Sequence, residues 1–253
     1  MKRKVLIVGI GAGHPEHMTA QAIDALNRVS VLFIPNKGEE KQDLARLRRD
    51  ICERFIRNDG YRLVDFNVPA RGSSPSYRET VARLHDDVAS IYERLLREEL
   101  GEEECGAFLV WGDPSLYDST MRVLERIRAK GNLELEYEVI PGISSVQALA
   151  AAFKIPLNRI GESVMVTTGR KLAVGFPANA DSVVVMLDGD CAFKTVDPDF
   201  EIYWGAYLGT GDQILISGKL RDVAEEIERA RRLARERKGW IMDTYLLRKP
   251  GKS

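Results

Sequence analysis

Cysteine and histidine are scarce in this chain of 253 residues, which contains three of each. The cysteines are odd in number and widely spaced, so they fit reduced thiols in the cytoplasm better than a disulfide framework. His14 and His17 lie three residues apart, but Pro15 stands between them and no third ligand is near in the sequence. We therefore expect no metal site.

An excess of positive charge is also missing. The formal net charge is −1 and the pI is about 6.4, so the composition does not indicate binding to nucleic acid. Arginines are nevertheless frequent in the first hundred positions, where acidic residues balance them. Solvated helix faces account for such a pattern, and an anionic small-molecule substrate is the alternative interpretation.

Long hydrophobic runs are absent, and none approaches the length of a membrane span. The basic N-terminus followed by apolar residues 5–10 resembles a signal peptide in charge. The run is short, however, and ends in a glycine-rich loop without a small-residue cleavage site. A first strand that is buried on both faces explains it better.

The order of apolar runs predicts an α/β fold of two domains. Up to about residue 118, apolar runs alternate with amphipathic helical patterns, which is typical of a parallel sheet. Near the end, the three expected strands 203–208, 214–220 and 240–247 have only one helix among them, which favours antiparallel pairing. We therefore expect a parallel N-terminal α/β domain over residues 1–117 and a mixed-sheet C-terminal α/β domain over residues 118–253.

Three expected strands end in loops rich in glycine, proline and serine. These loops are Gly-x-Gly-x-Gly at positions 9–13, Gly112-Asp113-Pro114, and the segment 141–145 with the sequence Pro-Gly-Ile-Ser-Ser. Ligands of open α/β sheets bind at the carboxyl ends of strands, in turns of this kind. Taken singly, each loop is also compatible with an ordinary strand-to-helix turn.

Nucleotide binding is the obvious alternative for the first loop. Its glycines are followed by His14 and do not form Gly-x-Gly-x-x-Gly, and the second strand ends at Pro35-Asn36-Lys37 without an acid that could hold a ribose. No glycine-lysine-serine/threonine follows, so a phosphate loop of the Walker type is missing as well. No arrangement typical of a Ser-His-Asp triad is present either.

Four motifs in order resemble those of the tetrapyrrole methylases, over nearly the whole chain. The first glycine loop continues into a Pro-Glu pair, a hydrophobic residue and Thr19, and a late Gly209-Thr210 with Gln213 accompanies the other two loops. The resemblance implies a homodimeric S-adenosylmethionine-dependent methyltransferase with a cofactor cleft between its two domains. One departure is that Met186-Leu187 stands where many relatives have Tyr-Met, which leaves open which residue contacts the adenine.

The cofactor contacts that the resemblance implies come from the three loops and from two later positions. They are Pro15, Trp111, Gly112, Asp113, Leu116, Ser144, Ser145, Leu187 and Tyr207. Ordinary structural roles are the alternative for several of them. Pro15 can shape a turn, Ser144 can cap a helix, and Leu187 can be a core residue.

The implied acceptor is a tetrapyrrole of corrin synthesis, precorrin-5, which is methylated at C-1 and loses acetate. Methyl transfer requires alignment of donor and acceptor more than a triad, whereas loss of the acyl group requires a group that handles a proton. Asp113 and Tyr117 are the expected catalytic residues, and Asp118 and Glu16 are further candidates.

The acceptor carries many carboxylates, which arginine binds in a bidentate manner. Arg71 and Arg170 follow expected strands and are the expected acceptor contacts, with solvated surface arginines as the alternative. The motifs define the cofactor better than the acceptor. Another precorrin or tetrapyrrole C-methyltransferase, a relative that acts on a peptide or RNA, and a non-catalytic S-adenosylmethionine-binding module all remain open.

Overall fold

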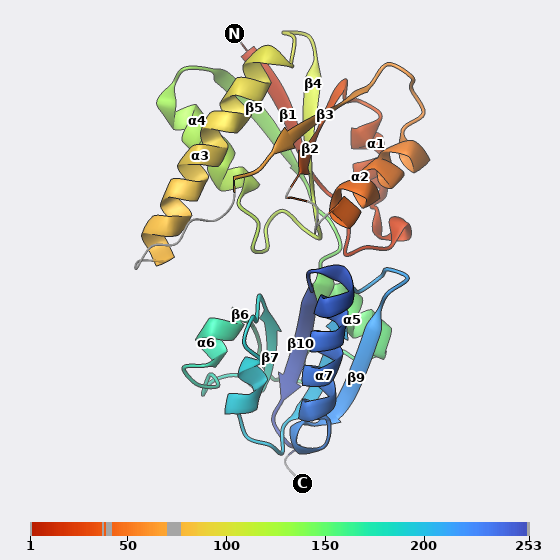
Figure 1. The fold of residues 1–253 in the computed structure, drawn as a ribbon, viewed down its shortest axis with the longest axis vertical. Helices are drawn as coiled ribbons and strands as arrows, with labels where there is room; N and C mark the ends of the chain where they lie inside the picture. Colours follow the sequence, from red (N-terminus) through yellow and green to blue (C-terminus); the bar gives the residue numbers. More distant parts are fainter. Residues whose placement is uncertain (1, 37, 39–41, 70–76, 252–253) are drawn as a thin grey trace. The chain divides into compact units, whose positions relative to one another are not determined.

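The computed structural model describes residues 2–36, 38, 42–69 and 77–251, and it confirms the predicted α/β class (Figure 1). Two compact units are present: Met1–Gly11 with Pro15–Ser144, and Ala12–His14 with Ser145–Ser253. The first unit contains β1 (Lys2–Gly9), η1 (Pro15–His17), α1 (Ala20–Leu26), β2 (Val31–Asn36), α2 (Gln42–Phe55), β3 (Arg62–Asn67), α3 (Tyr77–Glu98), β4 (Cys105–Val110), α4 (Thr120–Lys130) and β5 (Glu134–Ile140). The second contains α5 (Ser145–Phe153), β6 (Val164–Thr168), α6 (Gly169–Leu172), β7 (Ser182–Met186), η3 (Ala192–Thr195), β8 (Glu201–Ala206), β9 (Ile214–Lys219), α7 (Leu220–Lys238) and β10 (Asp243–Arg248).

The sheet of the first unit is entirely parallel, with the strand order β3-β2-β4-β1-β5. Helices α3 and α4 cover one face, and α1 and α2 cover the other (Figure 1). Strand β1, which lies between β4 and β5, is therefore buried on both sides, as its uninterrupted apolar sequence predicts. Thr19 caps α1, because its hydroxyl accepts a hydrogen bond from the Ala22 N–H at 3.0 Å.

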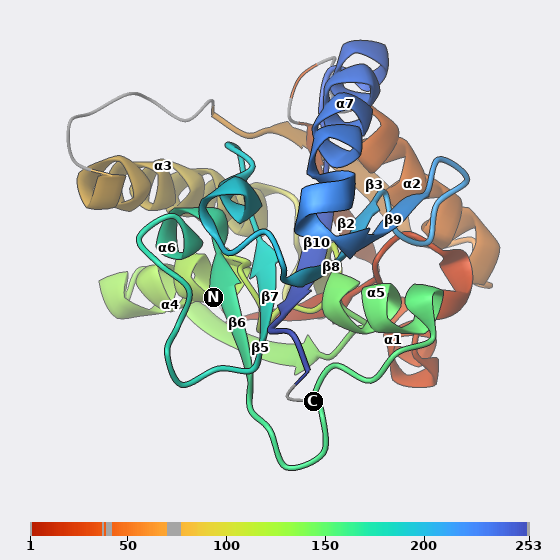
Figure 2. The same cartoon turned by 90° about the horizontal axis from the view of Figure 1, so that it is seen from below.

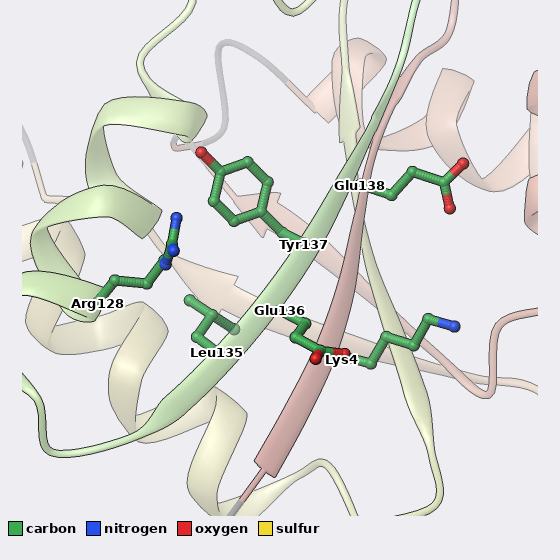
Figure 3. Close-up of a pocket in the computed structure, with 6 residues that line it drawn as sticks. All are labelled: Lys4, Arg128, Leu135, Glu136, Tyr137 and Glu138. Carbon is green, nitrogen blue, oxygen red and sulfur yellow. The ribbon is translucent and has the colours of Figure 1, made fainter.

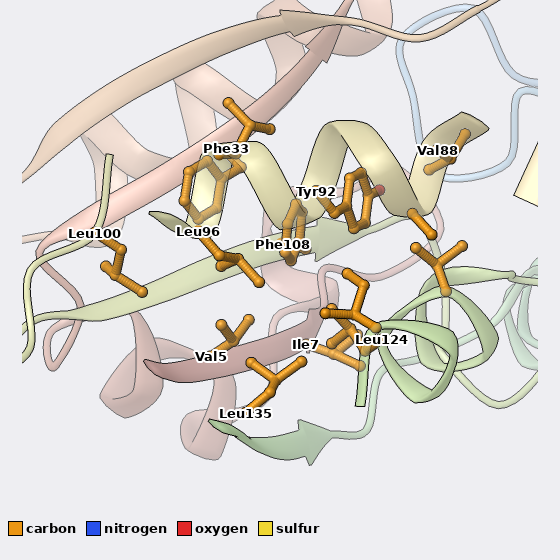
Figure 4. Packing of buried hydrophobic residues seen from close by; sticks show 14 of the residues in the cluster. Val5, Ile7, Phe33, Val88, Tyr92, Leu96, Leu100, Phe108, Leu124 and Leu135 are labelled. Carbon is orange, nitrogen blue, oxygen red and sulfur yellow. The ribbon is translucent and has the colours of Figure 1, made fainter. Parts of the chain in front are cut away.

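Stacked aromatic rings dominate the core between this sheet and α3 (Figure 4). The ring centroid of Phe108 on β4 lies 4.1 Å from that of Tyr92 on α3 and 4.9 Å from that of Phe33 on β2. Rigid rings buried against one another hold α3 and the two central strands in a fixed arrangement. The loops that leave these strands therefore start from well-defined positions.

The second unit has a mixed sheet with the order β6-β7-β10-β8-β9. Strands β6 and β7 are parallel, whereas β10 pairs antiparallel with both β7 and β8, and β8 pairs antiparallel with β9. Helix α7 packs on one face over a core that includes Trp204 and Tyr245 (Figure 2). On the opposite face, Phe153 of α5 packs edge-on against Tyr203, with the ring centroids 5.5 Å apart. The prediction of antiparallel strands near the end of the chain is confirmed.

The division between the units differs from the expected boundary after residue 117. Strand β5 pairs with β1 over seven residues, from Lys2↔Glu134 to Val8↔Ile140, so α4 and β5 belong to the first unit and it ends at Ser144. The pairing joins segments more than a hundred residues apart, which local sequence patterns do not reveal. In the described part of the chain, no helix has both the length and the apolar character that crossing a bilayer requires.

Candidate active site

The three glycine-containing loops of the first unit meet at one edge of its sheet. They leave β1, β4 and β5, which are neighbouring parallel strands, so their carboxyl ends lie side by side. The Ile10 N–H donates to the Val110 carbonyl at 2.9 Å. Gly11 and Gly112 then exchange two main-chain hydrogen bonds, with N···O distances of 2.8 and 3.3 Å. The first two loops are therefore joined along their main chains.

Close main-chain contact explains why glycine is needed in these loops. A β-carbon on Gly142 would lie 2.2 Å from the carbonyl oxygen of Gly112, and one on Gly9 would lie 2.7 Å from the Gly142 nitrogen. Real β-carbons do not approach other atoms so closely. The third loop thus packs directly on the other two, and no side chain separates them.

Asp113 links the second loop to the third. One carboxylate oxygen accepts hydrogen bonds from the N–H and hydroxyl of Ser115, and the other accepts one from the Gly142 N–H at 2.8 Å. Partial burial opposes ionisation, but these hydrogen bonds outweigh it and lower the pKa of Asp113. The side chain is therefore an anion at neutral pH, and both of its oxygens are engaged within the loops.

Most of the predicted cofactor contacts in the first unit belong to this cluster. Trp111 and Leu116 are half-buried beside Asp113, and the Leu116 N–H donates to the Asp113 carbonyl at 3.2 Å. Ser144 is buried, and its Cα lies 3.5 Å from the position that a β-carbon on Gly112 would take. Pro15 begins η1, the short helix that contains His17, and a β-carbon on Gly11 would lie 2.4 Å from the His17 β-carbon.

Tyr117 and Asp118 follow the same loop and differ in their environment. Tyr117 is 43% exposed and has a left-handed backbone with φ of 55°, which is strained for a residue with a side chain. Partial burial raises the pKa of its hydroxyl, so that group is protonated at neutral pH. The Asp118 carboxylate instead accepts a hydrogen bond from the Thr120 N–H at 2.7 Å, at the start of α4, which fixes the turn that leads into this helix.

In the second unit, Leu187 and Arg170 follow the neighbouring parallel strands β7 and β6. Leu187 is 64% exposed, so it is not a core residue, and its φ of 54° is left-handed. Gly169 packs against the adjoining loop, where a β-carbon on it would lie 2.5 Å from Asp188 Oδ1. The structure therefore brings the turns that carry Leu187 and Arg170 to one edge of this sheet, and both side chains are exposed.

A buried polar network holds the Leu187 turn in place. The Asp188 carboxylate accepts hydrogen bonds from the Ala192 N–H at 2.8 Å and from the Tyr245 hydroxyl at 2.7 Å. Arg231 of α7 donates to the Asp188 carbonyl at 2.5 Å and pairs with Asp243 at 3.2 Å. Nothing in the sequence motifs indicated this network.

Tyr207 differs from the expectation that its side chain lines an adenine pocket. The ring is buried in the core, and its hydroxyl donates to the Trp240 carbonyl at 2.6 Å. Its backbone is left-handed, with φ of 49°. The turn directs the side chain inward, so only the main chain of Tyr207 is available to a ligand.

Comparison with known proteins identifies the family. The profile of the family "Tetrapyrrole (Corrin/Porphyrin) Methylases" matches residues 4–224, which is most of the chain. The chain belongs to the tetrapyrrole methylases. These enzymes are S-adenosylmethionine-dependent methyltransferases, so the predicted fold, enzyme class and cofactor are confirmed.

Individual relatives support the same assignment. A protein from Sinorhizobium sp. named precorrin-6A synthase [deacetylating] is 56% identical over 249 residues, which are 98% of this chain and 95% of the relative. A cobalamin-synthesis-related protein from Corynebacterium diphtheriae has a TM-score of 0.84 at 37% identity and covers 98% of this chain and 99% of its own. A uroporphyrin-III C-methyltransferase from Thermus thermophilus, complexed with S-adenosylhomocysteine, shares the fold with a TM-score of 0.59, 17% identity and 97% coverage of both chains.

Thr244 is a residue of this tetrapyrrole methylase that the sequence motifs missed. It lies at the start of β10, in register with Met186 of β7 and Gly205 of β8. It is buried, and its hydroxyl lies 2.9 Å from the Ser145 hydroxyl. Thr244 thus connects three predicted contact segments of the second unit. A threonine that opens the apolar run 245–247 is the only sign of it in the sequence.

Arg71, the other expected acceptor contact, falls outside the described residues.

A hollow of about 560 Å³ lies on the edge strand β5, between Tyr137 and Arg128 on one side and Lys4 and Glu138 on the other (Figure 3). None of the predicted site residues lines this hollow, so it is not the candidate site.

The link made by Asp113 can be tested by replacing it with asparagine. We expect D113N to bind S-adenosylhomocysteine about tenfold more weakly, because one amide group cannot accept all the hydrogen bonds of the carboxylate. Calorimetric titration measures this, with D24N on the exposed face of α1 as the matched control.

The pKa of Asp113 in the folded protein lies below its ordinary value of 3.8. The contribution of the ionised Asp113 carboxylate to the loop structure is therefore complete above that pH and is lost only as the pH falls below it. A change in wild-type affinity between about pH 5 and about pH 9 that D113N abolishes would contradict this.

Proposed function

We propose that this methyltransferase transfers a methyl group to C-1 of precorrin-5 and releases the extruded two-carbon fragment as acetate, which forms precorrin-6A. The observation that carries the proposal is 56% identity, over 98% of the chain, to a relative named precorrin-6A synthase [deacetylating]. The packing of three main-chain loops at one sheet edge is consistent with a methyl donor held largely by backbone groups.

S-adenosylmethionine supplies the methyl group, and the residues present suit its two chemically different ends. In the first unit, the loops offer main-chain groups, a serine hydroxyl and a proline ring. The proposed contacts there are Pro15, Trp111, Gly112, Asp113, Leu116 and Ser144. In the second unit, Ser145, the exposed Leu187 side chain and the main chain of Tyr207 are the proposed contacts. An exposed leucine offers the apolar surface that a purine ring requires.

Asp113 and Tyr117 have different roles in this proposal. An ionised carboxylate with both oxygens engaged positions the loops and is not poised to donate a proton at neutral pH. Tyr117 has a protonated, partly exposed hydroxyl on the same loop. We assign it as the hydrogen-bond donor to the acyl oxygen when water attacks and the carbon–carbon bond to the macrocycle breaks.

The direct test of the proposal is incubation of the protein with precorrin-5 and S-adenosylmethionine. Mass spectrometry should detect a macrocycle that has gained one methyl group and lost the two-carbon fragment. An enzymatic assay should detect one acetate for each turnover. Turnover of a different precorrin in place of precorrin-5 would favour another C-methyltransferase of the family. Binding of S-adenosylmethionine without methylation of any precorrin would favour a binding module.

The variant Y117F tests the proposed hydroxyl. We expect acetate release to slow by about 100-fold, because the donor to the developing oxyanion is lost. Affinity for S-adenosylhomocysteine should stay unchanged. Y137F on β5 is the matched control, since its hydroxyl bonds Glu125 at the protein surface. If Y117F released acetate at the wild-type rate, Tyr117 would have no part in this step.

The acceptor contacts and the assembly state are further parts of the proposal. Arg71 and Arg170 are proposed to bind carboxylates of the macrocycle, and a raised acceptor KM in R71A and R170A would support this.

We also propose that the enzyme is a cytoplasmic homodimer. The edge strand β6 supports the dimer, because its Val164, Met165 and Val166 are each 38–40% exposed. Sedimentation analysis distinguishes a dimer from a monomer.

A further inference from the structure

Arg48 is a buried cation for which the described residues provide no counter-ion. It lies on α2 and is 7% exposed. Its Nε donates to the Leu109 carbonyl at 3.0 Å, and its Nη1 donates to the Leu44 carbonyl at 2.9 Å. In the described part of the chain, no carboxylate forms an ion pair with it. Arg231, which is similarly buried, pairs directly with Asp243.

The guanidinium lies where two strands of the first sheet separate. Pairing between β2 and β4 ends at Phe33↔Phe108, and Pro35 has no N–H with which to continue it. Arg48 donates instead to the carbonyl of Leu109, the next residue along β4. Arg48 therefore lies at the carboxyl edge of the sheet, next to the last residues of β4 and just before the loop that contains Gly112 and Asp113.

This position is a switch point in the connections of the sheet. Strand β2 continues into α2 on one face, whereas β4 continues into α4 on the other face (Figure 1). Where neighbouring strands send their connections to opposite faces, a crevice forms at their carboxyl ends, and ligands of open α/β sheets bind there. A cation at such a crevice attracts an anionic group of the ligand.

The groups that face Arg48 from the opposite helical layer do not neutralise it. Tyr92 of α3 interacts with Arg48 electrostatically and hydrogen-bonds Thr120, and burial raises the pKa of its hydroxyl, which leaves it uncharged. Among the described residues, the Asp118 carboxylate acts on Arg48 electrostatically, but it lies beyond ion-pair distance and accepts a hydrogen bond from the Thr120 N–H. Burial of an arginine without a close carboxylate is unfavourable, and a bound carboxylate would offset that cost.

We propose that Arg48 binds a carboxylate of one of the two reactants. The carboxylate belongs either to the methionine moiety of the cofactor or to an acetate or propionate side chain of the tetrapyrrole acceptor. Nε and one N–H of Nη1 already serve the Leu109 and Leu44 carbonyls, so the planar guanidinium would donate two parallel hydrogen bonds to such a group from its Nη1 and Nη2 end. This inference rests on the proposed function, since both reactants are those named there.

The test compares R48Q with two matched variants. R46Q removes an exposed arginine from the same helix. R3Q removes a buried arginine whose Nε donates to the Leu96 carbonyl at 2.8 Å, at the amino end of the sheet. R3Q therefore reproduces the structural loss away from the loops. Calorimetry gives the Kd of S-adenosylhomocysteine and of 5′-methylthioadenosine, which lacks the carboxylate, and kinetics give KM and kcat for precorrin-5.

Each source of the carboxylate gives its own result. If it is the cofactor, R48Q weakens S-adenosylhomocysteine by about 30-fold and leaves 5′-methylthioadenosine unchanged. If it is the acceptor, R48Q raises the KM for precorrin-5 by about 30-fold, lowers kcat less, and leaves both Kd values unchanged. Wild-type values for all of these constants, or equal losses in R3Q, would overturn the proposal.

A second variant keeps the proposal testable if R48Q does not fold. R48K retains the charge but loses the two-pronged geometry, and we expect about tenfold weaker binding of the same reactant. Wild-type Kd and KM values in R48K would then overturn the proposal. If the wild-type protein does not turn over precorrin-5, the proposed acceptor fails, whereas the comparison of the two cofactor analogues still decides the role of Arg48 toward the cofactor.

Discussion

Replacement of Gly142 by alanine is expected to weaken S-adenosylhomocysteine binding by about 100-fold, because displacement of the loops by about 1 Å removes the geometry on which binding depends. The added β-carbon would lie 2.2 Å from the Gly112 carbonyl oxygen and 2.9 Å from the Gly9 Cα. Both contacts are main-chain atoms, so no flexible side chain can move aside. Gly112 is in turn held to Gly11 by two hydrogen bonds, so a shift of one loop displaces the others.

The same substitution should lower stability moderately. Overpacking of a tight site costs about 1–3 kcal/mol, which corresponds to a decrease of several degrees in Tm for a protein of this size. Calorimetric titration and thermal unfolding measure the two effects separately. G60A is the matched control, since a β-carbon on Gly60 meets no atom within 4 Å. If G142A bound S-adenosylhomocysteine as the wild type does, the packing of the three loops would have no bearing on the cofactor.

Replacement of Asp243 by alanine is expected to destabilise the second unit by about 3–5 kcal/mol, the usual cost of leaving one member of a buried ion pair alone. Both side chains of the Arg231–Asp243 pair are 6% exposed. The same carboxylate oxygen also accepts a hydrogen bond from Trp204 Nε1 at 2.8 Å. Its removal therefore leaves a buried guanidinium and a buried indole N–H without their acceptor.

Denaturant unfolding followed by tryptophan fluorescence can measure this loss. The double variant D243A/R231M should recover part of the stability, because it removes the orphaned charge together with its partner. E228A is the control, since its ion pair with Lys194 is half-exposed on both sides and such surface pairs contribute little to stability. A D243A protein within about 1 kcal/mol of the wild type would show that the pair is dispensable.

The sequence indicated the strands and loops of the first unit's loop cluster because each of these parts is local. An apolar run that stops at glycine, as at Gly9 and Gly112, predicts both the strand and the loop that follows. Local patterns do not show that β1, β4 and β5 lie next to one another, because this depends on pairing between segments a hundred residues apart. For this reason, the sequence patterns did not indicate that the first compact unit extends to Ser144.

Side-chain direction was the other property that sequence patterns did not supply. Leu187 and Tyr207 both follow a strand and both have a left-handed backbone, yet the leucine is exposed and the tyrosine is buried. The outcome depends on which face of the sheet the turn leaves, and that follows from the tertiary fold. Arg48 left a clearer sign in the sequence, because it occupies the apolar face of its helix between Leu44 and Ile51.

The hydrogen bonds between Gly11 and Gly112 also have a consequence for the order of folding. They close a chain segment of about a hundred residues, and contacts of such long range form late because of their loop-closure entropy. The tie from Asp113 to Gly142 adds strand β5 to the same requirement. During synthesis, the cluster of three loops is therefore complete only after residue 142 has left the ribosome, which sets the earliest point at which the nascent chain could hold the cofactor there.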